Sequence, residues 1–185
     1  NTHGDLKYFA DTASTLEYAV GIAKESGQIL EFGVRFGTSA QILQAIAQCT
    51  VTGFDSFEGL PTAWHEQPAG AYSTGGQIPE LPNVQLIAGW FEDTLPVFVH
   101  QSPKPIRLVN IDCDLYSSTM TVLKELTPLF QAGTIIVFDE YLMNPKWRED
   151  EYKAFQEWLQ SSGWRYRYRA VSYFTNQVVV ELIGK

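Results

Sequence analysis

Two pairs of acidic residues stand where short apolar segments of the chain end. The first pair, Asp112 and Asp114, follows the apolar segment 108–111, and the second pair, Asp139 and Glu140, follows a similar segment. Helical periodicity begins directly after the first pair, so the pattern is strand, acidic turn and helix. Neighbouring parallel strands lie about 4.8 Å apart, which brings acids at adjacent strand ends together. We therefore expect the four carboxylates to face one another across a site.

Carboxylates in such an arrangement favour a bound cation. Several carboxylates this close cannot all stay ionised unless their pKa values rise or a cation joins them. Oxygen ligands without His or Cys select magnesium or calcium, and partial coordination by water favours magnesium. The competing interpretation is that Asp112 and Asp114 cap the following helix, while Asp139 and Glu140 lie in solvated turns. Capping needs one acid rather than four, which favours the metal site.

A second chemical signal is the glycine-bearing turn from Gly33 to Gly37, between a predicted strand over 28–32 and a predicted helix. Such a turn lets a ligand approach the backbone at a helix N-terminus. A dinucleotide-binding turn needs three glycines spaced G-x-G-x-x-G, whereas this turn has two, which fits S-adenosylmethionine enzymes better. Asp55 ends the next predicted strand, where an acid accepts hydrogen bonds from ribose hydroxyls. The alternative is an ordinary turn in which Asp55 is only a cap.

Apolar periodicity predicts one α/β domain that covers the whole chain of 185 residues. An amphipathic helix over residues 5–26 precedes the first strand, and Asn144 and Pro145 mark the start of the last helix. Five strand–helix units and a closing hairpin predict a doubly wound, mainly parallel, seven-stranded sheet with an antiparallel C-terminal strand. The strands are expected at residues 28–32, 51–54, 84–88, 108–111, 134–138, 164–171 and 178–183.

The segment 56–83 is rich in Gly and Pro and shows no helical or strand period. A connection of this length inside a compact domain is uncommon and is usually a lid or a binding loop. It carries Trp64, His65 and Tyr72, which are candidate substrate contacts. His65 is also a candidate second base because His titrates near neutral pH, although a lone loop His is more often simply solvated.

The composition of the chain disfavours several classes of function. The net charge of −8 argues against a nucleic-acid partner, since the chain has no basic stripe. Arg165, Arg167 and Arg169 alternate with aromatic residues, as expected for one face of a strand. Cys49 and Cys113 provide neither a disulfide framework nor zinc-type spacing. No apolar run reaches membrane length and no signal peptide is found, so we expect a cytoplasmic protein that acts on a small molecule.

Six motifs occur in one order between about residue 28 and residue 141. They are Glu31-Phe-Gly-Val34, Asp55-Ser-Phe-Glu-Gly-Leu-Pro61, Gly70-Ala-Tyr-Ser-Thr-Gly75, Gly89-Trp-Phe-Glu-Asp-Thr-Leu-Pro96, Asp112-Cys-Asp-Leu-Tyr-Ser-Ser-Thr119 and Phe138-Asp-Glu-Tyr141. These motifs resemble the macrocin O-methyltransferase family, whose members methylate sugar hydroxyls on macrolides and on aminocoumarins such as novobiocin. The resemblance implies a Rossmann-like class I methyltransferase fold that uses S-adenosylmethionine and magnesium.

The resemblance also implies roles for individual residues. Asp112, Asp139 and Glu140 would bind Mg²⁺ or another hard divalent cation, and Asp114 would be the general base. The family commonly has two aspartates where this chain has Asp139 and Glu140, so the metal geometry or preference can differ here. The residues expected to bind S-adenosylmethionine are Glu31, Gly33, Val34, Gly37, Thr38, Ser39, Asp55, Ser56, Phe57, Gly89, Trp90, Phe91 and Asp112. The candidate substrate contacts are Trp64, His65, Tyr72, Tyr116 and Tyr141.

The expected function is transfer of a methyl group to a hydroxyl of a sugar or another vicinal-diol small molecule, of the natural-product type, with Asp114 accepting the proton. The first alternative is a NAD-dependent Rossmann oxidoreductase, which the missing third glycine and the absence of a Tyr-x-x-x-Lys pair disfavour. The second is a non-catalytic binding protein with the same fold, which the retention of all four acids disfavours. A homodimer is compatible with each of these, and the identity of the acceptor stays open.

Overall fold

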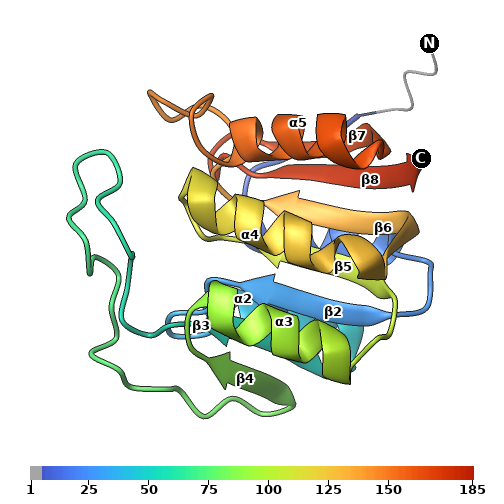
Figure 1. The fold of residues 1–185 in the computed structure, drawn as a ribbon. Coiled ribbons are helices and arrows are strands. Elements are labelled where there is room, and N and C mark those ends of the chain that lie inside the picture. The colour runs from blue at the N-terminus through green and yellow to red at the C-terminus, as the bar shows by residue number, and fades with distance from the viewer. Residues whose placement is uncertain (1–5) are drawn as a thin grey trace.

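A computed structural model describes residues 6–185, which form one eight-stranded sheet with helices on both faces (Figure 1). The strand order is β1-β7-β8-β6-β5-β2-β3-β4. The strands are β1 (Lys7–Phe9), β2 (Gln28–Phe32), β3 (Val51–Asp55), β4 (Val84–Ala88), β5 (Ile106–Ile111), β6 (Phe130–Phe138), β7 (Arg165–Ser172) and β8 (Val178–Gly184). The helices are α1 (Thr12–Ile22), α2 (Thr38–Ala47), α3 (Phe91–Gln101), α4 (Tyr116–Leu126), α5 (Glu151–Ser162) and the 3-10 turn η1 (Thr127–Leu129).

The strands from β2 to β6 form the parallel centre of the sheet. β2 pairs in parallel with β3 and β5, β3 with β4, and β5 with β6. β8 runs antiparallel between β6 and β7. The predicted doubly wound, mainly parallel sheet with an antiparallel C-terminal strand is therefore confirmed, and β1 adds an eighth strand beside β7.

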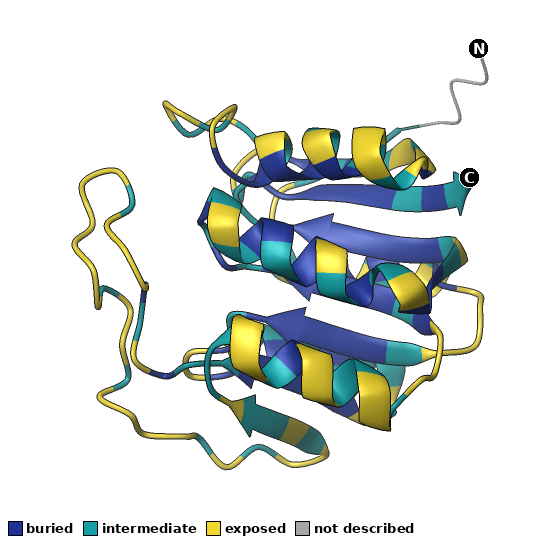
Figure 2. Ribbon diagram, viewed as in Figure 1, coloured by how far each residue is buried: buried dark blue, intermediate teal, exposed yellow. Residues whose placement is uncertain are grey.

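Helices cover both faces of the sheet, which explains the apolar sequences of its central strands. α3, α4 and α5 pack on the face turned toward the viewer in Figure 1, and α1 and α2 pack on the other face. Along β6, Ile136 and Phe138 enter the first core, whereas Ile135 and Val137 enter the second. A strand buried on both faces has a continuous apolar sequence rather than an alternating one. Figure 2 shows the central strands as buried and the outer sides of the helices as exposed.

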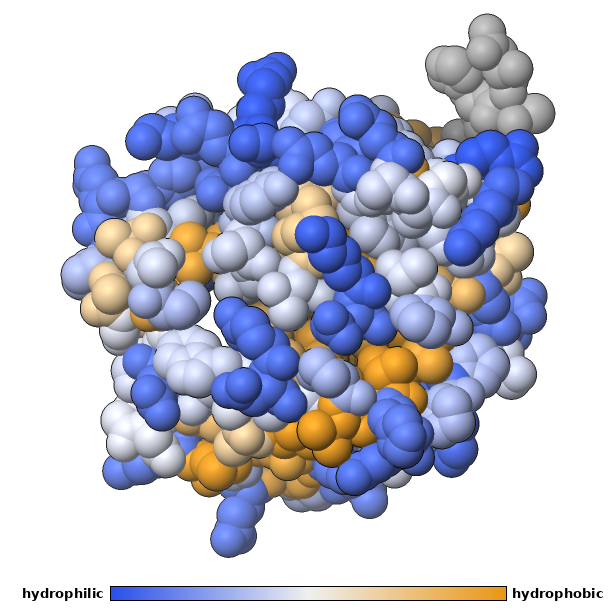
Figure 3. Space-filling model, in the orientation of Figure 1, coloured by the Kyte–Doolittle hydropathy of each residue, from blue (hydrophilic) through white to orange (hydrophobic). Residues whose placement is uncertain are grey.

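The outer surface over α3, α4 and α5 is largely hydrophilic (Figure 3). Hydrophobic side chains gather on this face over α3, where Val97 is 52% exposed. Some exposed apolar surface is ordinary for a folded domain. Among the described residues, none of the helices has the length and apolar character that crossing a bilayer requires.

The N-terminal region differs from the single helix that was expected over residues 5–26. Within the described part of this range, Lys7–Phe9 form β1, which pairs with β7, and α1 covers only Thr12–Ile22. Asp11 fixes the start of α1, because its carboxylate accepts a hydrogen bond from the Ser14 amide at 2.8 Å. The prediction was wrong here because pairing with β7, which lies far along the chain, outweighs the local helical pattern.

The start of the last helix is also later than predicted. α5 begins at Glu151, with Asp150 at its N-cap position, rather than at Asn144 and Pro145. Asn144 instead forms a local turn in which its side-chain oxygen accepts a hydrogen bond from the Lys146 amide at 3.0 Å. Asn side chains compete with helices in this way, since they bond to nearby backbone groups.

The connection between β3 and β4 covers residues 56–83 and contains neither helix nor strand, in agreement with its sequence. It extends beyond the carboxyl ends of the strands, in teal and green at the left of Figure 1. We call residues 60–71 the loop tip. Its base is closed by backbone hydrogen bonds between Leu60 and Ala71 and between Gly70 and Leu60, at 2.9 and 2.8 Å. Trp64 and Gln67 exchange two further backbone bonds at its far end.

Candidate active site

The two predicted acid pairs lie at the ends of neighbouring strands. The Asp112 amide donates to the Phe32 carbonyl at 2.8 Å, and the Asp139 amide donates to the Ile111 carbonyl at 2.9 Å. Each bond extends the parallel ladder one residue beyond its strand. Asp112 and Asp139 therefore stand next to each other at the carboxyl edge of the sheet, where open α/β sheets bind ligands.

Gly33 allows this close approach between β2 and β5. Its φ is +89°, and a Cβ atom built on it would lie 1.8 Å from the carbonyl oxygen of Asp112. A side chain at this position would thus face both an unfavourable backbone conformation and a collision with backbone. The sequence analysis assigned Gly33 to the approach of a ligand. In the structure, a glycine is required here because the Asp112 backbone lies so close.

Asp114 is held in a tight and strained turn. The Leu115 amide bonds to the Cys113 carbonyl at 2.6 Å across Asp114, whose φ is +59°. A bond between residues i and i+2 with positive φ at the centre is a γ-turn, which is rare and strained. Strain of this kind clusters at functional sites. Asp114 and Asp112 line the same cavity, with one residue between them.

Burial and mutual repulsion dominate the electrostatics of the acids. Burial raises the pKa of Asp112 well above its usual range, and the nearby Asp139 and Asp114 carboxylates raise it further. Burial also raises the pKa of Asp114 to about 7, with repulsion from Glu140 and Asp139 adding to it. The pKa of Asp139 rises to about 6, mainly through burial. Among residues 6–185, no group donates a side-chain hydrogen bond to Asp112 or Asp114. Within the same residues, no Lys, Arg or His forms an ion pair with any of the four strand-end acids.

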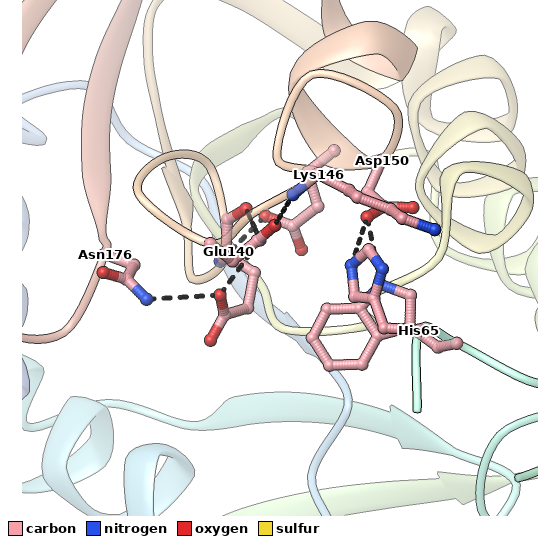
Figure 4. Close-up of polar contacts among 8 residues, drawn as sticks. His65, Glu140, Lys146, Asp150 and Asn176 are labelled. Atoms are coloured by element: carbon pink, nitrogen blue, oxygen red, sulfur yellow. Dashed lines mark hydrogen bonds and ion pairs between the residues drawn. The ribbon is translucent and has the colours of Figure 1, made fainter. Parts of the chain in front are cut away.

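Side-chain amides from the β7–β8 turn orient the second acid pair. Gln177 Nε2 donates to Asp139 Oδ1 at 2.5 Å. Asn176 Nδ2 donates to Glu140 Oε2 at 3.4 Å, as Figure 4 shows. Glu151 is buried at the start of α5 and accepts a hydrogen bond from the Glu140 amide at 3.1 Å. The sequence did not reveal Asn176 and Gln177 as partners, because only the antiparallel return of β8 places them beside β6.

Asp55 binds the backbone of the glycine turn directly. Its carboxylate accepts hydrogen bonds from the amides of Val34 at 2.8 Å, Arg35 at 2.7 Å and Phe57 at 2.7 Å. The interpretation of Asp55 as a turn cap is therefore correct. A carboxylate offers about four acceptor sites, so capacity remains for a ligand hydroxyl.

Glu31 lies beneath the glycine turn and is fully buried. One of its oxygens accepts a hydrogen bond from Asn110 Nδ2 at 3.0 Å, while the other has no partner among the described residues. Burial raises the pKa of Glu31 to about 7, although the hydrogen bond from Asn110 lowers it. Glu31 is thus a buried acid on β2, two residues before Gly33, with one oxygen unpaired among the described residues.

One cavity joins the glycine turn to the acids. The predicted residues that line it are Gly33, Val34, Asp55, Ser56, Gly89, Trp90, Phe91, Asp112, Asp114, Asp139, Glu140, Trp64 and Tyr72. Lining residues that the sequence analysis did not single out are Arg35, Gly59, Leu60, Pro61, Glu92, Cys113 and Ser118. Arg35 stacks on the ring of Tyr72 with 5.4 Å between its guanidinium carbon and the ring centre. The position of Arg35 between Gly33 and Gly37 could have identified it from the sequence as a site residue.

Several predicted site residues lie away from the cavity lining. Tyr116 donates a hydrogen bond to Glu157 of α5 at 2.5 Å, and Tyr141 is buried among core aromatic rings. The placement of both tyrosines therefore speaks against substrate contact. Phe57 is also buried, and His65 contacts Asp150. Glu31 also lies outside the lining. The remaining residues outside it, Gly37, Thr38 and Ser39, form the first turn of α2 and its N-cap.

The fold defines the class of protein. The calicheamicin methyltransferase CalS11 matches with a TM-score of 0.72 at 23% identity, over 92% of this chain and 77% of its own. The O-methyltransferase NovP matches with a TM-score of 0.71 at 20% identity, over 94% of this chain and 79% of its own. An O-methyltransferase from Bacillus cereus, solved in complex with SAH, matches with a TM-score of 0.59 at 15% identity, over 92% and 80%. The chain has the class I methyltransferase fold.

Sequence comparison points to a family within this class. The family model of macrocin-O-methyltransferase (TylF) matches residues 80–161. Demethyldecarbamoylnovobiocin O-methyltransferase of Streptomyces niveus is 28% identical over 156 residues, covering 69% of this chain and 58% of the relative. The 8-demethyl-8-(2,3-dimethoxy-alpha-L-rhamnosyl)-tetracenomycin-C 4'-O-methyltransferase of Streptomyces olivaceus is 25% identical over 146 residues, covering 64% and 54%. The resemblance to the macrocin O-methyltransferase family is confirmed, and the chain spans a little over half the length of these relatives.

Proposed function

We propose that this chain is an S-adenosylmethionine-dependent O-methyltransferase domain acting on a hydroxyl of a sugar or another vicinal-diol small molecule. The observation that carries the proposal is a single cavity lined by the glycine turn, by Asp55 and by the strand-end acids Asp112 and Asp114. The printed names of the relatives support it, since one is a novobiocin-type and the other a rhamnosyl-tetracenomycin O-methyltransferase.

The methyl donor would occupy the part of the cavity next to β2 and β3. Gly33 and Val34 would border its methionine portion, and Asp55 would accept hydrogen bonds from the ribose hydroxyls. Trp90 and Phe91, at the start of α3, would flank the adenine. Because Asp55 already fixes the amides of Val34 and Arg35, cofactor contact and turn geometry depend on the same carboxylate.

The strand-end acids suit a hard divalent cation such as Mg²⁺. No three His, Cys, Asp or Glu side chains within residues 6–185 form a ready-made metal site. The donor chemistry nevertheless fits, because the Asp112 carboxylate accepts no side-chain hydrogen bond within that range, and Asp114, Asp139 and Glu140 bring further carboxylate oxygens to the same cavity. Asp112, Asp139 and Glu140 would hold the cation. When bound, a divalent cation lowers the pKa of a coordinated hydroxyl.

We assign to Asp114 the role of general base, which takes the proton from the acceptor hydroxyl. A neutral alkyl hydroxyl is a poor nucleophile, so its proton must leave as the oxygen attacks. Asp114 lines the cavity from the γ-turn that follows β5. In this step the proton passes to Asp114, the new oxygen–carbon bond forms, and the bond between methyl carbon and sulfur breaks. The cavity walls contribute by holding the two reactants together.

Calorimetry with S-adenosylmethionine and with NAD, followed by a panel of diol acceptors and labelled methyl donor, tests this function. We expect binding of S-adenosylmethionine, no binding of NAD, and label transfer to at least one diol. Binding of NAD alone would establish the oxidoreductase alternative. Donor binding without transfer to any acceptor, in the presence of Mg²⁺, would favour the non-catalytic alternative.

A further inference from the structure

The loop tip is attached to the start of α5 through one carboxylate. Asp150 Oδ2 accepts a hydrogen bond from Trp64 Nε1 at 3.0 Å and lies 3.0 Å from His65 Nε2. Figure 4 shows His65 and Asp150 pointing toward each other from these two parts of the chain. The Asp150 side chain is only 11% exposed, so these contacts are shielded from water. Hydrogen bonds to a buried carboxylate are stronger than those between neutral groups.

Asp150 stands at the N-cap position of α5 but does not cap it. An Asp at this position normally accepts a hydrogen bond from the second or third amide of its helix. Here Asp150 makes no side-chain cap bond, and its φ and ψ of −108° and −122° lie outside the usual N-cap conformation. The carboxylate is therefore directed to the loop tip instead of to its own helix.

The backbone of the loop tip is shaped for this contact. His65 has a φ of +51°, a conformation that costs a residue other than glycine about 1 kcal/mol or more. Two backbone bonds between Trp64 and Gln67 hold the turn, at 2.9 and 2.8 Å. As a result, two consecutive side chains reach the same carboxylate, with their rings 4.6 Å apart.

The attachment has a consequence for the cavity, because Trp64 lines it together with Asp114 and Glu140. Glu151 directly follows Asp150 and accepts a hydrogen bond from the Glu140 amide. The start of α5 therefore binds both Trp64 and Glu140, which line the same cavity. An indole offers a flat apolar face with one polar atom, and binding that atom fixes the plane of the ring.

We propose that Asp150 is a positioning residue that orients Trp64 as an apolar platform for the ring of the acceptor. This inference rests on the proposed methyltransferase function for the nature of the ligand, but the attachment of the loop tip stands independently of it. Asp150 acts through Trp64 and touches no reacting atom. It should therefore influence acceptor binding more than the chemical step or methyl-donor binding.

Hydrogen exchange of residues 60–71, measured by mass spectrometry, tests the attachment without any substrate. Asp150→Ala removes the acceptor of both contacts, whereas Trp64→Phe keeps a ring and removes only the indole N–H. Exposed Glu149 is a neighbouring acid, so Glu149→Gln is the matched control. We expect exchange to rise about tenfold in Asp150→Ala and Trp64→Phe, as the loss of a charged hydrogen bond implies, and to stay unchanged in the control. Unchanged exchange in both variants would overturn the proposal.

Kinetics with a diol acceptor tests the positioning role. We expect Asp150→Ala to raise the acceptor KM about tenfold, while kcat and the Kd for S-adenosylmethionine stay within about twofold. Asp150→Asn retains a neutral oxygen for the indole N–H and should recover part of the loss. A fall in kcat with unchanged KM would contradict the platform role. If the wild-type chain transfers no methyl group, the proposed function fails, whereas the exchange experiment still decides the attachment.

Discussion

Gln177 donates a hydrogen bond to Asp139 over 2.5 Å, although 38 positions separate the two residues. Gln177 is fully buried, and its side-chain oxygen accepts a hydrogen bond from the Thr175 hydroxyl at 3.0 Å, which fixes the orientation of the amide. The turn between β7 and β8 thus presents a single donor to one of the two acids at the end of β6. An acid that is buried beside other acids needs such a donor to keep one orientation.

Replacing Gln177 should therefore destabilise the protein through Asp139. We expect Gln177→Leu to lower the free energy of unfolding by about 1–3 kcal/mol, because a buried carboxylate loses its donor. Urea denaturation followed by circular dichroism measures this. Exposed Gln101 at the end of α3 provides the comparison, since Gln101→Leu should change stability by less than about 0.5 kcal/mol. Equal effects of the two substitutions would contradict a role for the Asp139 contact.

Asp114→Asn should remove activity while preserving the fold. Asn tolerates positive φ as well as Asp does, so the γ-turn at +59° is retained. An amide cannot accept the proton of the acceptor hydroxyl, and general bases contribute about 10²- to 10⁴-fold to rates. We expect kcat to fall in that range, with an unchanged Kd for S-adenosylmethionine by calorimetry. Near-normal turnover would remove Asp114 from this role.

Chelation should silence methyl transfer if the strand-end acids bind a cation. We expect EDTA to abolish label transfer and added Mg²⁺ to restore it. Mg²⁺ should also stabilise the wild type against heat, by about 2.7 kcal/mol at one hundred times its Kd. This stabilisation should disappear in Asp112→Asn, which provides a readout independent of turnover. Full activity in EDTA would exclude a functional metal.

Stability should fall as pH rises through the range in which Glu31 titrates. Burial raises its pKa from 4.5 to about 7, so between these values the folded protein keeps a proton that the unfolded chain has lost. Stability is thus highest below about pH 4.5 with respect to this group, declines toward pH 7, and is level above it. The decline is of the order of 3 kcal/mol for Glu31 alone, since each pKa unit corresponds to about 1.4 kcal/mol.

Glu31→Gln isolates this contribution. The variant cannot ionise at this position, so its unfolding free energy should fall less between pH 5 and pH 8 than that of the wild type. Urea denaturation at both pH values gives the difference. Exposed Glu58→Gln is a control that should leave the pH dependence unchanged. Parallel pH profiles of wild type and Glu31→Gln would show that Glu31 is not the responsible group.

Gly33→Ala should destabilise the domain far more than an alanine at another glycine with positive φ. Gly76 has a φ of +77° with nothing within 4 Å of an added Cβ, whereas at Gly33 that atom would meet the Asp112 carbonyl at 1.8 Å. Gly76→Ala should therefore cost only about 1–2 kcal/mol of backbone strain. We expect Gly33→Ala to cost at least about 3 kcal/mol more, measured by thermal unfolding. Similar melting temperatures would contradict the close approach seen here.

The positions of β2 to β8 could be predicted from the sequence to within a few residues. β2 and β4 occupy the predicted ranges 28–32 and 84–88. For β2 the reason is that a strand buried on both faces has a short apolar run between polar turns, whereas β4 is a half-exposed edge strand. The irregular segment 56–83 was predictable for the opposite reason, since Gly and Pro disfavour both regular structures. The acid pairs at the ends of β5 and β6 could be recognised because parallel strands end at one edge.

Tertiary structure alone decided which distant groups meet those acids. Sequence periodicity carries no information on pairing between residues as far apart as Gln177 and Asp139, or Trp64 and Asp150. It also could not show that Tyr116 turns toward α5, since a helix start offers several directions to a side chain. The sequence by itself determined the strands and the acids at their ends, because those depend on local alternation and turn chemistry. The partners that orient the acids were decided only when β8 folded back beside β6 and the loop tip reached α5.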